Sequence, residues 1–196
     1  MQVYIVHGYC ASGLDHWFLW LAEELRARGA RVSIVELPAR EPPEPDEWQV
    51  ALATQVHALD RNSYFVSHSL GGIATLRYLE SAAANETIGG YILVSGFNAR
   101  LATLPQLDAF ATPNLNCLRL ANMAGSRVVI AARDDPSVPH AMSERLAISL
   151  RAAFVSVPRG GHFLASDGFC EFPLLLGQTT DWFGRASDLA AGIRIP

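Results

Sequence analysis

The fold of this chain is decided by the stretch YFVSHSLG at residues 64–71. Apolar residues suited to a buried strand lead into a serine that has small residues two positions before and two positions after it, and a helix-forming stretch follows from Gly72 to Glu80. A serine flanked by small residues between a strand and a helix is typical of a nucleophile elbow of the G-x-S-x-G kind, because small neighbours let the backbone turn sharply. Ser67 takes the place of the first glycine. The pattern indicates Ser69 as a nucleophile, whereas a serine in such a turn can also simply cap the helix.

Two further stretches supply an acid and a base in the order that a catalytic triad of this kind needs. The apolar run 127–132 ends just before Asp134 and Asp135, and the run 153–157 ends before a glycine-rich loop that carries His162. An imidazole within hydrogen-bond reach makes a serine hydroxyl nucleophilic, and a carboxylate fixes the tautomer of that imidazole. Three separately weak signals in this order predict a triad, although an aspartate ahead of a proline is often a simple turn residue.

The oxyanion that develops in such a reaction needs backbone N–H donors. One donor is expected from the residue after the nucleophile, Leu70. The other is expected from the loop after the first strand, where Tyr9 follows a His-Gly pair and Cys10 is the alternative. The other histidines are interpreted as packing, capping or loop-ordering residues without chemistry. They are His7, His16, His57, His68 and His140.

Composition limits what the chain can bind. Its 196 residues suit one domain, which we predict over residues 1–184, followed by a C-terminal tail at residues 185–196. A net charge of −4 gives no sign of the basic patch with which proteins hold nucleic acid. The three cysteines form neither a disulfide framework nor a zinc-site spacing. We therefore expect no nucleic-acid partner. The chemistry of a serine-histidine-acid triad implies no metal and no organic cofactor.

The N-terminus runs straight into a strand, without a basic region or a signal-length apolar core. No apolar run approaches the ~20 residues that span a bilayer. We therefore expect a soluble, cytoplasmic protein that does not bind membranes. The oligomeric state, a monomer or a small homo-oligomer, is left open by the sequence.

Strands and helices alternate along the chain, which is the pattern of a parallel sheet covered by helices on both faces. Most of the strands are near-continuous apolar runs, as strands buried on both faces should be. The predicted strands are residues 2–6, 31–36, 63–66, 90–95, 127–132 and 153–157. The predicted helices are residues 15–28, 47–59, 71–83, 140–151 and 171–184.

The longest stretch without a clear strand is residues 97–125. In larger enzymes of this architecture a cap domain occupies this place, whereas here there is room only for a loop with or without one short helix. We therefore predict an α/β fold of about six parallel strands, with no large cap domain and an open site.

Several segments together resemble one known family. They are Val6-His7-Gly8-Tyr9 with His16-Trp17, Ser67-His68-Ser69-Leu70-Gly71, Ile92-Leu93-Val94-Ser95-Gly96-Phe97, Asp134-Asp135 with Val138-Pro139, and Gly160-Gly161-His162-Phe163 leading to Gly168-Phe169. The chain resembles, nearly end to end, the small α/β-hydrolases of the YdeN-like serine hydrolase family, which are related to the retinoblastoma-binding-protein-type serine hydrolases. The resemblance implies a minimal sheet without the two leading strands of the full fold, and a triad of Ser69, Asp135 and His162.

The choice of Asp135 over Asp134 rests on this resemblance and on spacing. Hydrolases of this fold often place the acid three residues ahead of a Val-Pro pair, and Asp135 stands in that relation to Val138. Asp134 is then expected to cap or brace the turn.

The leading interpretation is a serine hydrolase that cleaves small carboxyl esters, thioesters or short amides through an acyl-enzyme on Ser69. One alternative is an interaction protein that has kept the hydrolase scaffold, since a fold does not determine a function, but an intact triad argues against it. Another is an acyltransferase or perhydrolase, which shares the acyl-enzyme and differs only in the acceptor. Phe97, Phe110 and Phe163 suit an apolar acyl pocket and equally a core.

Overall fold

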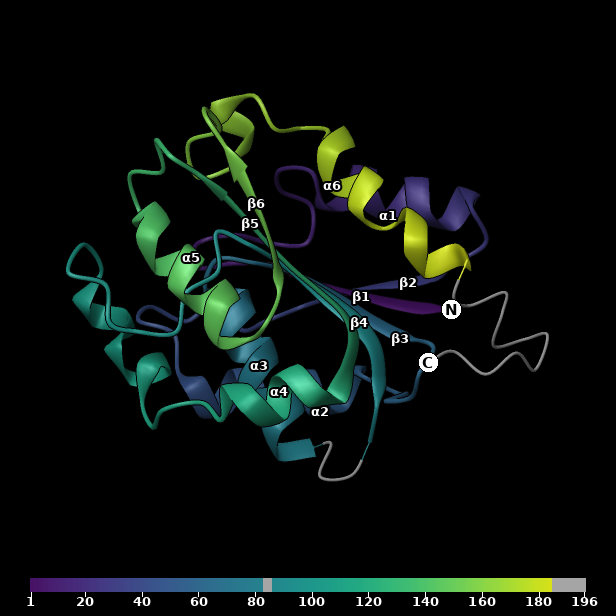
Figure 1. The fold of residues 1–196 in the computed structure, drawn as a ribbon. Coiled ribbons are helices and arrows are strands. Elements are labelled where there is room, and N and C mark those ends of the chain that lie inside the picture. Colours follow the sequence, from purple (N-terminus) through teal and green to yellow (C-terminus); the bar gives the residue numbers. More distant parts are fainter. Residues whose placement is uncertain (83–85, 185–196) are drawn as a thin grey trace.

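Six parallel strands form one sheet at the centre of the computed structural model, which describes residues 1–82 and 86–184 (Figure 1). The strands are β1 (Gln2–Val6), β2 (Arg31–Val35), β3 (Ser63–His68), β4 (Ile88–Val94), β5 (Ala124–Ala132) and β6 (Ala153–Val157). The predicted tail 185–196 and the last residue of the helix predicted over 71–83 lie outside the described residues.

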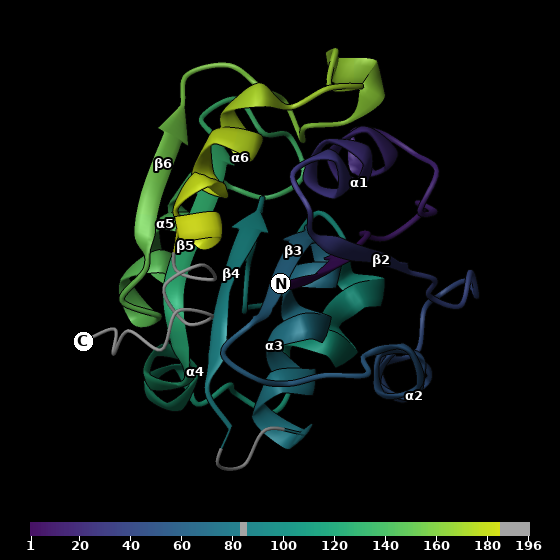
Figure 2. The same cartoon turned by 90° about the vertical axis from the view of Figure 1, so that its right-hand side faces the viewer.

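The strands lie in the order β2-β1-β3-β4-β5-β6, and every neighbouring pair is parallel. Figure 2 shows them side by side, from β6 at one edge of the sheet to β2 at the other. The chain goes from β1 outward to β2 and then returns to the other side of β1 to form β3. The loops that follow β1 and β3 therefore lead to opposite faces of the sheet and diverge at the carboxyl ends of these strands. Open sheets of this kind bind ligands at such a point.

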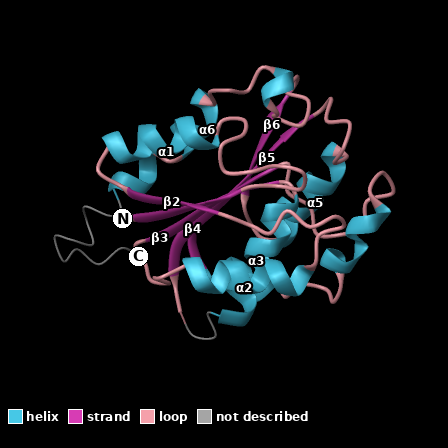
Figure 3. Cartoon of the chain, turned by 180° about the vertical axis from the view of Figure 1, so that it is seen from behind, coloured by secondary structure: helices cyan, strands magenta, loops and turns pink. Residues whose placement is uncertain are grey.

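Different helices cover the two faces of the sheet (Figures 1 and 3). Side chains alternate along each strand, so that Val3 and Ile5 pack under one set of helices and Tyr4 and Val6 under the other. The first face carries α1 (Phe18–Ala27) and α6 (Pro173–Gln178), and the second carries α2 (Pro45–Gln55), α3 (Leu70–Ala82), α4 (Cys117–Met123) and α5 (His140–Ser149). The predicted sheet covered on both faces is thus confirmed.

Helix α2 ends four residues before its predicted end at residue 59. The hydroxyl of Tyr4 accepts hydrogen bonds from the backbone N–H groups of His57 and Ala58, at 3.1 and 3.0 Å. These N–H groups therefore bond to a strand residue of the sheet and not to the preceding helical turn. The helix stops because a contact from far along the chain competes with its own hydrogen bonds.

Helix α1 begins at Phe18, three residues after its predicted start. The carboxylate of Asp15 accepts hydrogen bonds from the N–H and the hydroxyl of Ser12, at 2.7 and 2.9 Å, and closes a turn instead of a helix. His16 follows with a φ of 54°, which is not a helical value. The loop between β1 and α1 is longer than predicted for this reason.

The connection from β4 to β5 contains the 3-10 helix η1 (Pro105–Ala111) and α4, two short helical segments where at most one was expected. Phe97 and Phe110 from this connection lie buried in the core beside α2 and α3. The described residues thus hold no large cap domain over the sheet, as predicted. No helix among them is both long and apolar enough to traverse a bilayer.

Candidate active site

Ser69 lies between the last residue of β3 and the first residue of α3, with a φ of 51°. A residue other than glycine in this left-handed region is strained, and it persists because its surroundings hold it there. The N–H of Ser69 donates to the carbonyl of Val94 at 2.8 Å, which ties the turn to the neighbouring strand. This is the sharp strand-to-helix turn that the sequence predicted.

The small residues around Ser69 have separate structural reasons. A Cβ atom on Gly71 would overlap the carbonyl oxygens of Val6 and His7, so that only glycine lets α3 start this close to the end of β1. Ser67 is fully buried, and its hydroxyl lies 2.8 Å from that of Thr75 in α3. Because the helix supplies this polar partner, serine fits in place of the glycine of the usual pattern.

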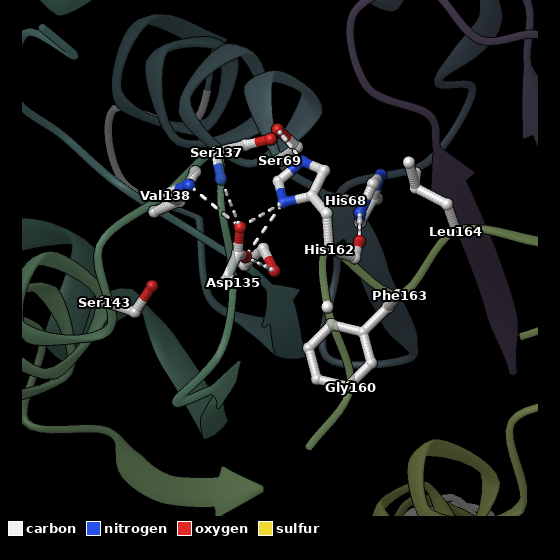
Figure 4. A network of polar contacts seen from close by, with 12 residues as sticks. His68, Ser69, Asp135, Ser137, Val138, Ser143, Gly160, His162, Phe163 and Leu164 are labelled. Carbon is white, nitrogen blue, oxygen red and sulfur yellow. Dashed lines mark hydrogen bonds and ion pairs between the residues drawn. The ribbon is translucent and has the colours of Figure 1, made fainter. Parts of the chain in front are cut away.

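Ser69, His162 and Asp135 form one hydrogen-bonded row across three loops of the carboxyl edge (Figure 4). The Nε2 atom of His162 lies 2.9 Å from Ser69 Oγ, and its Nδ1 atom lies 2.9 and 3.0 Å from the two oxygens of Asp135. An ionised carboxylate only accepts hydrogen bonds, so Nδ1 carries the ring proton. The lone pair of Nε2 is therefore directed at the serine hydroxyl.

Asp135 is held by hydrogen bonds from its own loop and from the residue after β4. One oxygen accepts from the N–H groups of Ser137 and Val138, at 2.8 and 2.9 Å, and the other accepts from the hydroxyl of Ser95 at 2.7 Å. Burial by itself would raise the pKa of this carboxyl, but the hydrogen bond and charge of His162, together with the Val138 and Ser95 donors, bring its pKa below the ordinary value. The acid is thus an ionised and oriented partner for the imidazole.

Asp134 lies on the exposed side of the same loop. Its carboxylate accepts from the N–H groups of Gly160 and Gly161, at 2.8 and 3.0 Å, and these two bonds lower its pKa. It therefore braces the loop before His162, whose Nδ1 atom is paired with Asp135 and not with Asp134.

The loop after β1 passes close to Ser69, since a Cβ atom on Gly8 would lie 3.1 Å from the Cβ atom of Ser69. Nδ1 of His7 donates to the carbonyl of Gly8 at 2.9 Å, and Nε2 of the same ring accepts from the N–H of Leu37 at 3.3 Å. The carbonyl and N–H of a trans peptide point in opposite directions, so that His7 also orients the N–H of Tyr9. Among the described residues this N–H has no protein acceptor, and the N–H of Leu70 lies in the first turn of α3, where backbone donors have no partner within the helix.

Known proteins resemble this chain in sequence and in structure. The family model for serine hydrolases matches residues 3–179. The chain belongs to the serine hydrolase family. It is 41% identical over 184 residues to YdeN of Bacillus subtilis (strain 168), and the match covers 94% of this chain and 97% of that one. The crystal structure of the ydeN gene product superposes with a TM-score of 0.90, over 93% of this chain and 98% of that one. The resemblance to YdeN-like hydrolases is thus confirmed.

More distant structures share the fold of this serine hydrolase. The meta-cleavage product hydrolase CumD from Pseudomonas fluorescens IP01 is 15% identical, with a TM-score of 0.67 over 92% of this chain and 91% of that one. Est1E from Butyrivibrio proteoclasticus is 12% identical, with a TM-score of 0.67 over 96% of this chain and 88% of that one. The predicted α/β-hydrolase fold is confirmed by these neighbours.

Sequence reasoning missed Ser95 of this hydrolase. It follows β4 with a φ of 49° and donates to the acid from the loop next to the elbow. Its place at the carboxyl end of a central strand was the signal that could have found it.

The other histidines have different surroundings. His57 is exposed, and His140 contacts the hydroxyl of Ser156 at 2.9 Å. His16 accepts from the N–H of Ala165 at 3.1 Å. His68 is buried and its ring centre lies 4.8 Å from that of His162. Within residues 1–82 and 86–184, no three His, Cys, Asp or Glu side chains gather as a metal site would require.

Proposed function

We propose that this serine hydrolase cleaves small carboxyl esters through an acyl-enzyme on Ser69, with thioesters and short amides as further substrates. The observation that carries the proposal is the position of His162, 2.9 Å from the hydroxyl of Ser69 and 2.9 Å from the carboxylate of Asp135. Each distance is that of a hydrogen bond already formed, which is the geometry that general-base catalysis needs.

In the first half of the reaction, Ser69 Oγ attacks the ester carbonyl while its proton moves to Nε2 of His162. Asp135 steadies the imidazolium, and the N–H groups of Tyr9 and Leu70 hold the oxyanion of the tetrahedral intermediate. As the intermediate collapses, His162 returns the proton to the departing alkoxide. An alcohol leaves and the acyl group stays on Ser69.

In the second half, His162 takes a proton from water as the hydroxide attacks the acyl-enzyme. A second tetrahedral intermediate forms, with its oxyanion held by the same two N–H groups. Its collapse returns the proton to Ser69 Oγ and releases the carboxylic acid. No metal or organic cofactor takes part in the proposed steps.

Esters with short acyl chains suit this site best. Phe97, Phe110 and Phe163 are buried in the core, and are therefore not free to line a long acyl pocket. A methylene gains about 0.8 kcal/mol only where its burial is complete, so methylenes that extend into water gain nothing. Esters of about two to six acyl carbons should be hydrolysed best.

Labelling with a fluorophosphonate tests the proposal. The phosphonyl group mimics the tetrahedral intermediate, so mass spectrometry should find one adduct on the peptide that carries Ser69, and Ser69→Ala should abolish it. Turnover of p-nitrophenyl esters of increasing chain length should fall beyond short chains and be absent in the variant. A protein that gives no adduct on Ser69 favours the interaction scaffold instead. Products that carry added alcohol or peroxide in place of water point to acyl transfer or perhydrolysis.

The pH dependence of turnover tests the role of the base. Only a neutral His162 can accept the serine proton, so kcat should fall on acidification. The lowered pKa of Asp135 keeps the acid charged as the imidazole takes up a proton, so that the loss belongs to His162. A rate that stays flat from about pH 5 to 8 in a folded protein, with chemistry limiting, contradicts the role.

A further inference from the structure

The loop that carries His162 is attached to the body of the protein through its backbone. Two carboxylates bind the N–H groups of the loop. Asp134 accepts hydrogen bonds from the N–H groups of Gly160 and Gly161. The carboxylate of Asp167 accepts from the N–H groups of His162 and Leu164, at 2.9 and 3.1 Å. These bonds close the loop on itself and onto the acid loop.

Two carbonyl groups of the loop are held by side chains from much earlier in the sequence, 94 and 146 positions away. Nε2 of His68 lies 2.8 Å from the carbonyl oxygen of His162, and the indole N–H of Trp17 donates to the carbonyl of Phe163 at 3.2 Å. A carbonyl only accepts, so Nε2 of His68 carries the proton. Phe163 has a φ of 57°, which turns the two neighbouring carbonyls toward separate donors.

His68 occupies a place where an apolar ring would pack well. It is 2% exposed, and the rings of His16, Trp17 and Phe18 surround it at centre distances of 6.0, 6.1 and 5.9 Å. Its Nδ1 atom is buried and has no hydrogen-bond partner among the described residues. An unpaired buried nitrogen is unfavourable, so a histidine here needs a reason that phenylalanine would not meet.

We propose that His68 and Trp17 are positioning residues for the general base, and that they keep Nε2 of His162 at hydrogen-bond distance from Ser69 by holding the carbonyls of His162 and Phe163. The inference rests on the proposed function in taking His162 as the base. Nε2 is at the far end of the imidazole from the backbone, so a tilt of the peptide is amplified there. A displacement of about 1 Å can lower a rate by about 100-fold.

The burial of His68 agrees with this role. Burial lowers its pKa to about 3, helped by the nearby charges of His162 and His16 and opposed by Asp135 and the bond to the His162 carbonyl. The ring therefore stays neutral. A charged ring at a centre distance of 4.8 Å would oppose the imidazolium that forms on His162 during attack.

The first test uses the native protein. The ¹⁵N shifts of the His68 ring at neutral pH should show the neutral tautomer with its proton on Nε2, protected from exchange. A ring that is protonated on Nδ1, or charged, overturns the inference whatever the activity of the protein is. This measurement needs no variant to fold.

The second test compares variants by kcat, KM and melting temperature. His68→Phe keeps a ring but removes the donor, and kcat should fall about 10- to 100-fold with KM within about twofold. His68→Gln restores an N–H donor of similar reach and should recover most of the loss. Trp17→Phe should lower kcat about fivefold, as expected for one neutral hydrogen bond.

The matched control is Trp182→Phe, a buried indole that donates to Ser126 away from the site. It should lower the melting temperature as much as Trp17→Phe does and leave kcat unchanged. Folded His68→Phe with the kcat of the native protein, or His68→Gln as slow as His68→Phe, overturns the inference. If the native protein takes no fluorophosphonate on Ser69, the proposed function fails, and the His68 tautomer still reports whether the contact exists.

Discussion

The elbow at Ser69 and the loop of His162 bring the serine hydroxyl and the imidazole Nε2 atom to 2.9 Å from each other by different means. The elbow is shaped by its own backbone, with Ser69 at a φ of 51° and Gly71 pressed against the end of β1. The histidine loop is shaped by side chains from elsewhere, since His162 and Phe163 are held by residues 94 and 146 positions away.

The difference has a physical reason. A strained turn between a strand and a helix needs small residues within a few positions, and the elements on both sides hold it rigid. The histidine loop follows β6, the last strand and one edge of the sheet, and it has no helix directly behind it, because η2 (Ala165–Asp167) is only a short 3-10 turn. Its N–H groups and carbonyls must therefore be paired by side chains, of which Asp167 is its own and Asp134, His68 and Trp17 come from other parts of the fold. Activity should therefore be sensitive to side-chain volume at the elbow, and to the loss of hydrogen bonds at the histidine loop.

The largest effect is expected from Asp135→Asn, which leaves the elbow intact and removes the charge that orients His162. The amide favours the wrong tautomer of the imidazole, so kcat should fall by about four orders of magnitude. Steady-state hydrolysis of a short p-nitrophenyl ester measures this. Asp134→Asn is the control, because the amide oxygen still accepts from Gly160 and Gly161, and kcat should stay within about tenfold. A larger loss at Asp134 than at Asp135 reverses the assignment.

A smaller effect is expected from Gly71→Ala, which tests the elbow by volume alone. The added methyl overlaps the carbonyl oxygens of Val6 and His7, so the backbone must shift. We expect the free energy of unfolding to fall by about 3 kcal/mol and kcat by about 100-fold. Chemical denaturation and ester hydrolysis measure the two quantities.

The control for this change is the next residue. A Cβ on Gly72 would meet Leu93 at 3.7 Å, which is ordinary contact, and alanine favours the helix by up to about 1 kcal/mol. Gly72→Ala should therefore be as stable as the native protein or more so. Equal losses at both glycines would mean that the close approach to β1 is not what shapes the elbow.

The smallest effect is expected from Ser95→Ala, which removes one of the donors to Asp135. Alanine can keep the backbone, while the carboxylate loses a hydrogen bond at 2.7 Å. We expect kcat to fall about tenfold, because hydrogen bonds to charged groups are stronger than neutral ones. Ser143→Ala is matched to it, since that buried hydroxyl donates to the carbonyl of Gly96 and not to the acid. Similar kcat values for the two variants would remove Ser95 from the site.

Much of the fold could be predicted because it depends on neighbours along the chain. Apolar runs predicted all six strands, and β1 and β6 begin and end where expected. The ends of α1 and α2 were missed, because Asp15 closes a turn before one helix and the hydroxyl of Tyr4 takes the N–H groups that would have extended the other. Tyr4 lies 53 residues before His57, so the sequence around the end of α2 does not contain this partner.

Local patterns along the chain are enough to establish which residues are able to meet. They are a serine in a turn that needs small neighbours, and an acid and a histidine after two later strands. The tertiary structure decided how they meet. The register of β5 and its loop turns Asp135 inward and Asp134 outward, and the sheet order brings Ser95 to the acid and His68 and Trp17 to the histidine loop. Local conformation follows from short-range sterics, whereas these hydrogen bonds join positions that only the folded sheet makes neighbours.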